Sequence, residues 1–183
     1  MSYYVSKLKS PDSSVIKYKI QIILLALTLA FSVATHAETI DGRVVGIADG
    51  DTLTVLDAGN TQFKIRLAAI DAPEKAMPFG QRSKEQLSDI CYGKQVSVTV
   101  VDTDRYGRTV GEVVCDGTNA NETMIKSGLA WVYRKYAKGY GHLYAFEEDA
   151  KAARRGLWAD PNPTAPWEWR KAKRNKNRVS RQN

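Results

Sequence analysis

The sequence predicts an α+β fold dominated by a small closed barrel of five β-strands, with about three helices inserted and appended. Five short segments have the alternating apolar pattern or the β-branched composition of strands, and turn residues bound them. Three further segments have polar, helix-forming composition with apolar or capping residues at helical spacing. About 146 of the 183 residues follow an N-terminal leader, which is enough for one domain with a single core.

The five expected strands are short runs that end at glycine, proline, asparagine or aspartate. Phe63, Ile65, Leu67 and Ala69 are expected on one face of the third strand. Pro73 ends that region because proline donates no ladder hydrogen bond, and Gly46 tolerates a bend in the first strand. The expected strands span residues 39–48, 52–56, 63–70, 95–101 and 109–115.

Three helices are expected between and after these strands. In the first, Leu87 and Ile90 lie three residues apart among polar neighbours. The second has asparagines that can cap its first turn, and a glycine follows the end of each helix. The helices span residues 79–90, Asn119 or Asn121 to Ser127, and 142–155.

Residues 1–37 have the order of a secretory signal peptide. Lys17 and Lys19 precede an apolar run over 20–34, and residues 35–37 (Thr-His-Ala) place small side chains at the −3 and −1 positions of a cleavage site. The run is shorter than the roughly 20 residues of a membrane span. We therefore expect export to the periplasm or the extracellular space, with no stable membrane association after cleavage. The alternative is an uncleaved anchor that tethers the protein to a membrane.

The chain has two cysteines, Cys91 and Cys115, and both follow the leader. An oxidising compartment permits them to form one disulfide, which is the pairing we expect. The alternative is a pair of buried free thiols.

The formal net charge of +7 is unevenly distributed. Residues 38–158 contain 16 basic and 17 acidic side chains, whereas residues 159–183 contain 7 basic and 2 acidic ones. We expect the second segment to be a disordered basic tail. Such a tail either neutralises nucleic-acid phosphates without sequence preference or is only a solvated segment that aids solubility.

The residue types that follow the leader exclude several kinds of catalysis. The one histidine among them, His142, lies at the start of an expected helix, where a surface or capping role is usual. The chain has no G-x-S-x-G sequence, no Walker glycine loop and no His/Cys zinc spacing. Carboxylates and arginines, with a metal ion, suit hydrolysis of a phosphodiester, because cations neutralise its nonbridging oxygens while a carboxylate orients or deprotonates water.

The most informative stretch is residues 49–74, DGDTLTVLDAGNTQFKIRLAAIDAPE. A strand pairing that brings Asp51 near Asp71 creates a pocket rich in oxygen ligands, which calcium prefers. Arg66 and Glu74 then stand beside this pocket.

These residues resemble the signatures of the thermonuclease family, the phosphodiesterases similar to micrococcal (staphylococcal) nuclease. The first signature, D-G-D-T followed by an arginine and D-x-P-E, occurs at residues 49–52, Arg66 and 71–74. The second, D-[KR]-Y-G-R, occurs at residues 104–108. The resemblance assigns residues 38–158 to a nuclease-like domain and implies the OB-fold, a five-stranded Greek-key barrel.

The resemblance also implies a single calcium ion. Its ligands are the side chains of Asp51 and Asp71 and the backbone carbonyl of Ala72. The family often has a hydroxyl residue at that third position, and alanine keeps the carbonyl. Asp49 and Thr52 are implied to support these ligands without binding the ion.

The same resemblance implies three catalytic residues. Glu74 corresponds to the residue that positions or activates the attacking water. Arg66 and Arg108 correspond to the pair that binds the phosphate and stabilises the transition state. Arginine suits that place because its planar fork donates two hydrogen bonds to phosphate oxygens.

Three tyrosines, Tyr106, Tyr133 and Tyr136, are candidates to contact the nucleotide, because aromatic faces stack on bases without reading sequence. The family has two tyrosines spaced by one residue; the spacing here differs, and Tyr136 matches the second tyrosine better. Two tryptophans are expected in the core, Trp131 and Trp158.

These expectations describe a secreted or periplasmic, calcium-dependent endonuclease that acts as a monomer. The resemblance implies hydrolysis of DNA and RNA with low sequence specificity to products with a 3′-phosphate. The alternative is a non-catalytic nucleic-acid-binding OB-fold module, although such modules typically lack part of the catalytic set that is present here.

Overall fold

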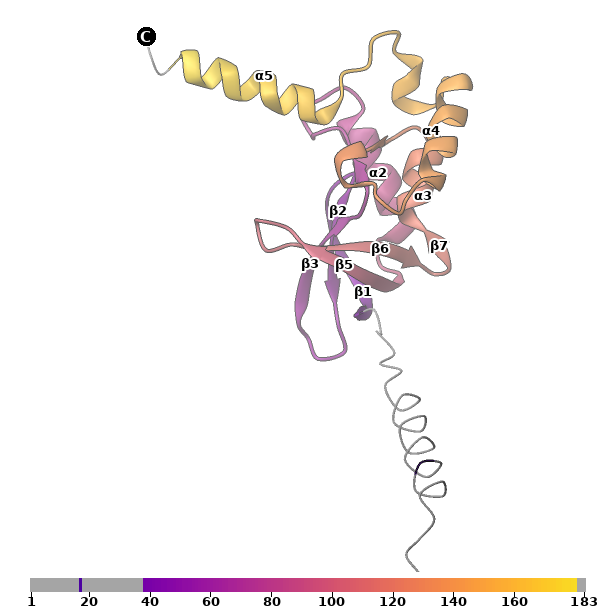
Figure 1. Ribbon diagram of the computed structural model, residues 1–183. Helices are drawn as coiled ribbons and strands as arrows, with labels where there is room; N and C mark the ends of the chain where they lie inside the picture. The colour runs from indigo at the N-terminus through magenta and orange to yellow at the C-terminus, as the bar shows by residue number, and fades with distance from the viewer. Residues whose placement is uncertain (1–16, 18–37, 181–183) are drawn as a thin grey trace, which may run out of the picture. The chain divides into compact units, whose positions relative to one another are not determined.

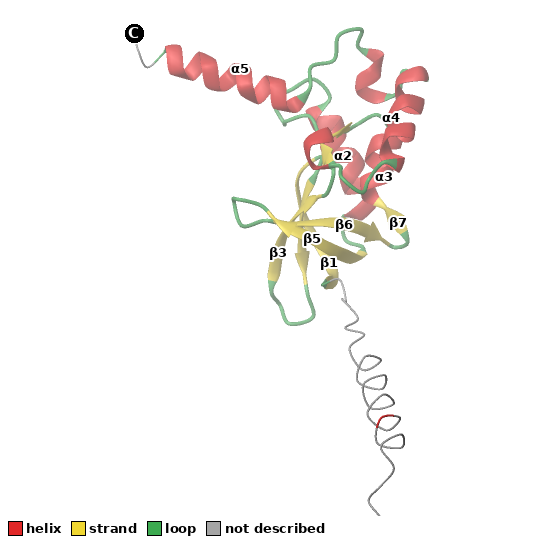
Figure 2. Ribbon diagram, in the orientation of Figure 1, coloured by secondary structure: helices red, strands yellow, loops and turns green. Residues whose placement is uncertain are grey.

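Five strands close into a barrel: β1 (Thr39–Asp49), β2 (Thr52–Leu56), β3 (Gln62–Leu67), β5 (Gln95–Thr103) and β6 (Thr109–Cys115). Neighbouring strands pair antiparallel in the order β3-β2-β1-β5-β6, and a parallel pairing of β3 with β6 closes the barrel (Figures 1 and 2). This is the barrel-dominated α+β OB-fold that the sequence predicts.

The structure is a computed structural model that describes Lys17 and residues 38–180. Apart from Lys17, the predicted signal peptide lies outside the described residues. The elements named here belong to one compact unit, Ala37–Asn183. Among the described residues, no helix is both long and apolar enough to cross a membrane.

The inward faces of the strands match the predicted alternation. Leu53 and Val55 of β2, and Ile65 and Leu67 of β3, are buried in the barrel interior. Burying one such side chain contributes about 1.5–3 kcal/mol to folding. This packing fixes the register of β2 against β3, because a slip of one residue exposes the apolar face.

The third strand ends earlier than the predicted span of 63–70. Strand β3 stops at Leu67, and Ala69 adopts a left-handed backbone conformation with φ 63°. That turn removes the following residues from the barrel ladder. They form strand β4 (Ile70–Asp71), which pairs antiparallel with β8 (Trp131–Val132).

The three predicted helices are present: α2 (Gly80–Cys91), α3 (Ala120–Lys126) and α4 (His142–Ala152). They gather beside one end of the barrel (Figure 1). Asn119 caps α3, since its side chain accepts a hydrogen bond from the Glu122 N–H at 3.0 Å. The short elements that remain are β7 (Thr118–Asn119) and the 3₁₀ turns η1 (Arg134–Tyr136) and η2 (Gly156–Ala159).

Two buried polar side chains tie these helices to β6, to the turn before β4 and to β8. The Asn121 carbonyl in α3 accepts from the Val113 N–H at 2.9 Å, and its amide donates to the Ala68 carbonyl at 2.9 Å. Glu147 in α4 accepts from the Val132 N–H at 2.8 Å. The turn that precedes Asp71 and the strand that pairs with it are therefore both held by helices.

A fourth helix, α5 (Pro166–Val179), lies in the segment 159–183 that was expected to be disordered. The expectation relied on charge, but lysine and arginine are good helix formers, and a proline at the first position favours helix initiation. The ring of Trp167 stacks on Tyr133 with parallel planes and centroids 5.3 Å apart. That contact gives the first turn of α5 a packing partner, whereas residues 171–180 are exposed.

Cys91 and Cys115 form the predicted disulfide, with Cα atoms 5.2 Å apart. It joins the last residue of α2 to the last residue of β6. The free-thiol alternative is therefore wrong in this structure.

Replacing both cysteines by serine should lower the free energy of unfolding by roughly 3–4 kcal/mol, because the bridge closes a loop of about 25 residues in the unfolded chain. Denaturant unfolding of the oxidised protein and the double variant measures this difference. Equal midpoints, or two titratable thiols in the denatured, unreduced protein, would contradict it.

Candidate active site

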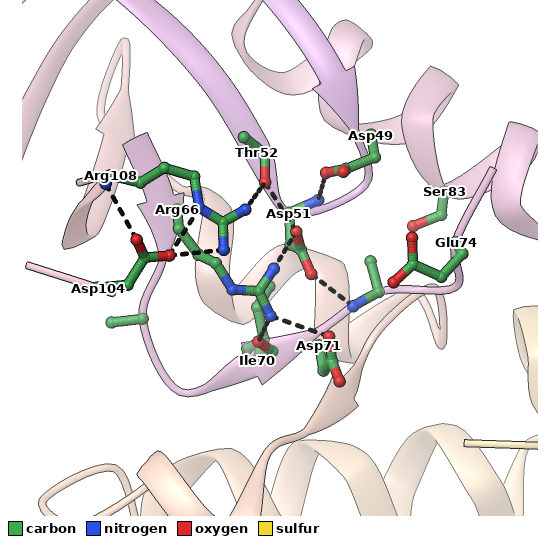
Figure 3. A network of polar contacts seen from close by, with 12 residues as sticks. Asp49, Asp51, Thr52, Arg66, Ile70, Asp71, Glu74, Ser83, Asp104 and Arg108 are labelled. Carbon is green, nitrogen blue, oxygen red and sulfur yellow. Dashed lines mark hydrogen bonds and ion pairs between the residues drawn. The ribbon is translucent and has the colours of Figure 1, made fainter. Parts of the chain in front are cut away.

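The barrel register brings the sequence motifs to one end of the barrel. Thr52 pairs with Arg66 between β2 and β3, and Arg66 pairs with Val110 between β3 and β6. The turn that carries Asp51, the end of β3 that carries Arg66 and the loop that precedes β6 therefore meet (Figure 3).

Gly50 permits the close approach that places Asp51 at this end. A Cβ atom at Gly50 would lie 1.8 Å from Ser83 Oγ and 2.9 Å from Ala72 Cβ. Ser83 is itself fixed, because its hydroxyl donates to the Leu129 carbonyl at 2.7 Å. The glycine of the D-G-D-T sequence is thus required by contact with α2 and with the residue after Asp71.

Arg66 lies between the two predicted metal ligands (Figure 3). Its Nη1 forms an ion pair with Asp51 Oδ1, and its Nη2 contacts Asp71 Oδ1 at 2.9 Å and the Ile70 carbonyl at 3.2 Å. Asp51 and Asp71 are 3% and 0% exposed. Since one guanidinium reaches both carboxylates, both face the same point.

Further contacts fix the orientation of Asp51. The Thr52 hydroxyl donates to Asp51 Oδ1 at 3.0 Å, and the Ala72 N–H donates to Asp51 Oδ2 at 2.8 Å. The Asp49 carboxylate accepts from the Asp51 N–H at 3.2 Å. The structure therefore places Asp49, Thr52 and the Ala72 backbone next to Asp51, with the N–H of Ala72 and not its carbonyl making the contact.

Arg108 approaches the same group from the β5–β6 loop. Asp104 holds it, because Arg108 Nε and Nη2 lie 2.7 Å and 2.6 Å from Asp104 Oδ2. Arg108 Nη1 also donates to the Thr52 hydroxyl at 3.4 Å. Arg66 and Arg108 are thereby linked through Thr52 and Asp51, so the predicted arginine pair is brought together.

Glu74 has a partner that the sequence reasoning missed. Arg170, from α5, contacts Glu74 Oε1 at 2.7 Å and both oxygens of Asp71, at 2.5 Å and 3.2 Å. The available signal was the stretch of residues 165–169, which places proline and two tryptophans in an otherwise basic tail. Such apolar residues are inconsistent with a segment that has nothing to pack against.

The predicted nucleotide-contacting tyrosines are only partly brought together. Tyr133 and Tyr136 meet edge to face, with ring centroids 5.0 Å apart, and Trp167 covers the ring face of Tyr133. Tyr106 lies in a different loop, is 70% exposed, and has Arg105 stacked on its ring at 4.8 Å. Tyr106 therefore has the most accessible of the three rings.

The remaining predictions concern the two tryptophans expected in the core and the histidine expected in a surface or capping role. Trp131 and Trp158 pack edge to face with centroids 4.3 Å apart, and Trp158 is buried while Trp131 is half-buried. His142 is surface-exposed, and its Nε2 lies 3.6 Å from Glu122. No contact of His142 with the carboxylate pair is present among the described residues.

The electrostatics of the site follow from burial and from the two arginines. Burial favours the neutral form of Asp51, but the Arg66 charge and the Ala72 N–H outweigh it and hold the pKa of Asp51 below its ordinary range. Burial raises the pKa of Asp71, and the hydrogen bond from Arg170 opposes this rise. Burial and the adjacent Asp51 raise the pKa of Asp49 to about 6.

The donor set fits a hard cation with few protein ligands. Within residues 38–180, no three Asp, Glu, His or Cys side chains surround a common point, so an ion would rely on two carboxylates, backbone oxygen and water. Asp51 and Asp71 are buried, face one point and already attract a cationic group, Arg66. These oxygens are the ligands that calcium or magnesium prefers.

Carboxylates and arginines that meet at one end of an OB-fold barrel suit the hydrolysis of phosphodiesters. The family described as staphylococcal nuclease homologue matches residues 64–160. The chain therefore belongs to that family, and it is a nuclease.

Individual relatives cover most of the chain. An uncharacterized endonuclease from Haemophilus influenzae is 47% identical over 153 residues, which are 82% of this chain and 85% of that protein. Micrococcal nuclease from Shigella flexneri is 40% identical over 166 residues, 85% and 94% of the two chains. A probable staphylococcal-like nuclease from Oryza sativa subsp. japonica is 44% identical over 141 residues, 70% of this chain and 42% of that protein.

The raised pKa of Asp49 predicts a specific pH dependence of stability. Between its ordinary value of 3.8 and about 6, the folded state keeps a proton that the unfolded state releases, so Asp49 lowers the stability as the pH rises through this range. Asp49→Asn stays neutral and lacks this loss. Its thermal midpoint relative to the unaltered protein should therefore rise from pH 4 to pH 6 in the presence of chelator.

Asp41→Asn, at an exposed position of β1, is the matched control that removes one carboxylate from a different position. Parallel melting curves for Asp49→Asn and the unaltered protein at every pH would refute the shifted pKa.

Proposed function

We propose that this nuclease is an exported, calcium-dependent endonuclease that hydrolyses DNA and RNA with low sequence specificity and leaves 3′-phosphate ends. The observation that carries the proposal is the convergence of two buried carboxylates, Asp51 and Asp71, with Arg66 between them and Arg108 linked through Thr52. A surface ion pair has no reason to bury two aspartates this completely, because burial of charge is costly.

Calcium would be held by Asp51, Asp71 and the carbonyl of Ala72, supported by Asp49 and Thr52. When bound, the ion supplies positive charge to the nonbridging oxygens of the scissile phosphate. The Arg66 guanidinium favours the ionised form of Asp51, and Arg66 and Arg170 both contact the Asp71 carboxylate, so that each ligand lies beside positive charge.

Arg66 and Arg108 bind the phosphate and stabilise the charge that grows on it in the transition state. Arg108 is held in place by Asp104, so its guanidinium needs little reorganisation when a phosphate binds. Glu74 orients the water that attacks phosphorus. The water oxygen bonds to phosphorus while the bond from phosphorus to the 5′ oxygen breaks. The water gives up one proton and the 5′ oxygen takes up one, which leaves a 5′ hydroxyl and the 3′-phosphate product.

Low sequence specificity is consistent with the aromatic residues near the site. Tyr106 and Tyr136 are 70% and 57% exposed, and their rings offer faces on which any base can stack. Such stacking contributes about 1–3 kcal/mol for each base without reading its edges.

Export is proposed from the signal-peptide pattern of residues 1–37. The Cys91–Cys115 disulfide supports it, since such bonds persist in oxidising compartments. After cleavage we propose that the protein acts as a monomer without stable membrane association.

The test is digestion of plasmid DNA and of RNA by the purified protein in calcium, in chelator, and with Arg66→Ala. We expect chelator to remove most activity, and Arg66→Ala to lose about 10²–10³ in rate because one preorganised phosphate contact is gone. Arg43→Ala, at an exposed arginine of β1, is the control and should keep full activity.

Full activity in chelator would rule out the calcium requirement. An inactive unaltered protein in calcium would favour the non-catalytic binding module. End-group analysis that finds 5′-phosphates would contradict the proposed bond cleavage.

A further inference from the structure

Arg170 clamps two carboxylates of the active site. Its Nη2 lies 2.5 Å from Asp71 Oδ2, and its Nη1 lies 3.2 Å from Asp71 Oδ1 and 2.7 Å from Glu74 Oε1. The guanidinium therefore reaches Asp71 with both terminal nitrogens and Glu74 with one of them. Only a planar fork with several donors can make this set of contacts, which an ammonium group cannot reproduce.

Glu74 depends on Arg170 for its orientation. It lies in the loop between β4 and α2, and its side chain is 35% exposed. Its backbone N–H contacts Met77 Sδ at 3.3 Å. Within residues 38–180, Arg170 is the one hydrogen-bond and ion-pair partner of its carboxylate. A glutamate on a loop samples several rotamers unless a contact selects one.

The start of α5 is anchored well enough to hold this clamp in place. Ala165 and Pro166 are buried, and Trp167 stacks on Tyr133 and meets Trp131 edge to face at 5.7 Å. Trp167 and Arg170 are three residues apart and so lie on the same face of the helix. The aromatic contact therefore directs Arg170 toward the carboxylates.

The charges of the site also require a second cation. Arg66 contacts Asp51 and Asp71 and compensates one of the three negative charges of Asp51, Asp71 and Glu74. Asp71 has no exposed surface, and an uncompensated buried charge is strongly destabilising. Arg170 supplies compensation at Asp71 Oδ2, which Arg66 does not contact, and shares Asp71 Oδ1 with Arg66.

We propose that Arg170 is a positioning residue of this nuclease, which holds Glu74 in the orientation that the attacking water requires. The inference rests on the proposed role of Glu74. It makes the first turn of α5 a part of the active site, although the sequence places that turn in a basic tail outside the nuclease-like domain.

If α5 were instead an inhibitory strap that blocks the active site, Arg170 would make the same contacts, but its removal would have the opposite effect on the rate of cleavage. The positioning role is favoured because Arg170 adds to the Arg66 contacts instead of replacing them, and because buried residues anchor α5. Removing a strap raises the activity, whereas removing a positioning residue lowers it, so the sign of the effect separates the two.

The experiment compares Arg170→Ala and Arg170→Lys with the unaltered protein in steady-state cleavage of DNA in calcium. We expect kcat of Arg170→Ala to fall about 10–100-fold, as for other residues that orient a functional group, with little change in KM. The kcat of Arg170→Lys should lie between those of Arg170→Ala and the unaltered protein, because lysine keeps the positive charge but lacks the planar guanidinium. Added guanidinium ion should partly restore kcat of Arg170→Ala and leave the unaltered protein unchanged.

The matched control is Arg174→Ala, which removes the same charge from an exposed position one turn further along α5 and should keep kcat. Thermal unfolding confirms that each variant is folded; if Arg170→Ala is not, Arg170→Gln takes its place in the same comparison.

If the unaltered protein is active and Arg170→Ala has an equal or higher kcat, the positioning role is overturned while the proposed function stands. A higher kcat would identify α5 as an inhibitory strap. A fall in kcat that guanidinium ion does not restore and that Arg174→Ala shares would indicate only a structural effect, and so would also overturn it. An unaltered protein without activity in calcium would instead overturn the proposed function, and the positioning role with it.

Discussion

Buried negative charge is the constraint on which the rest of this structure depends. Asp51 and Asp71 lie almost entirely out of water, and two carboxylates in such a place are tolerated only when cations and hydrogen-bond donors surround them. Arg66 supplies the shared cation, and the Thr52 hydroxyl and the Ala72 N–H supply donors. The same arrangement leaves a strong local demand for positive charge, which a metal ion or a phosphate-binding arginine can meet.

The barrel satisfies this constraint with segments that are far apart in sequence. Closure by the β3–β6 pairing sets Arg66 next to the loop that carries Arg108. The left-handed turn at Ala69 takes Asp71 off the barrel ladder and buries it beside β8. Asn121 and Glu147 then fix that turn and that strand from two helices, so the scaffold around Asp71 consists of hydrogen bonds whose partners are themselves buried.

Much of this arrangement could be predicted from the sequence, because the barrel and the motifs leave strong local signals. Alternating apolar residues located the five barrel strands, and D-G-D-T, the arginine and D-A-P-E located the carboxylate site. The end of β3 at Leu67 was not predictable in this way, since residues 68–70 continue the apolar run and the positive φ of Ala69 is a product of tertiary packing. The spacing of the tyrosines gave no hint that Trp167 covers Tyr133.

Arg170 shows why composition alone misjudged the end of the chain. Averaged over residues 159–183 the charge is strongly positive, which is typical of disorder, but Arg170 has fixed carboxylate partners, whereas residues 171–180 are exposed. The difference lies in Trp167, whose aromatic contacts repay the ordering of the first helical turn. Within this basic segment, the start of α5 packs against Tyr133 and Trp131, and this packed part contributes a precisely placed side chain to the site.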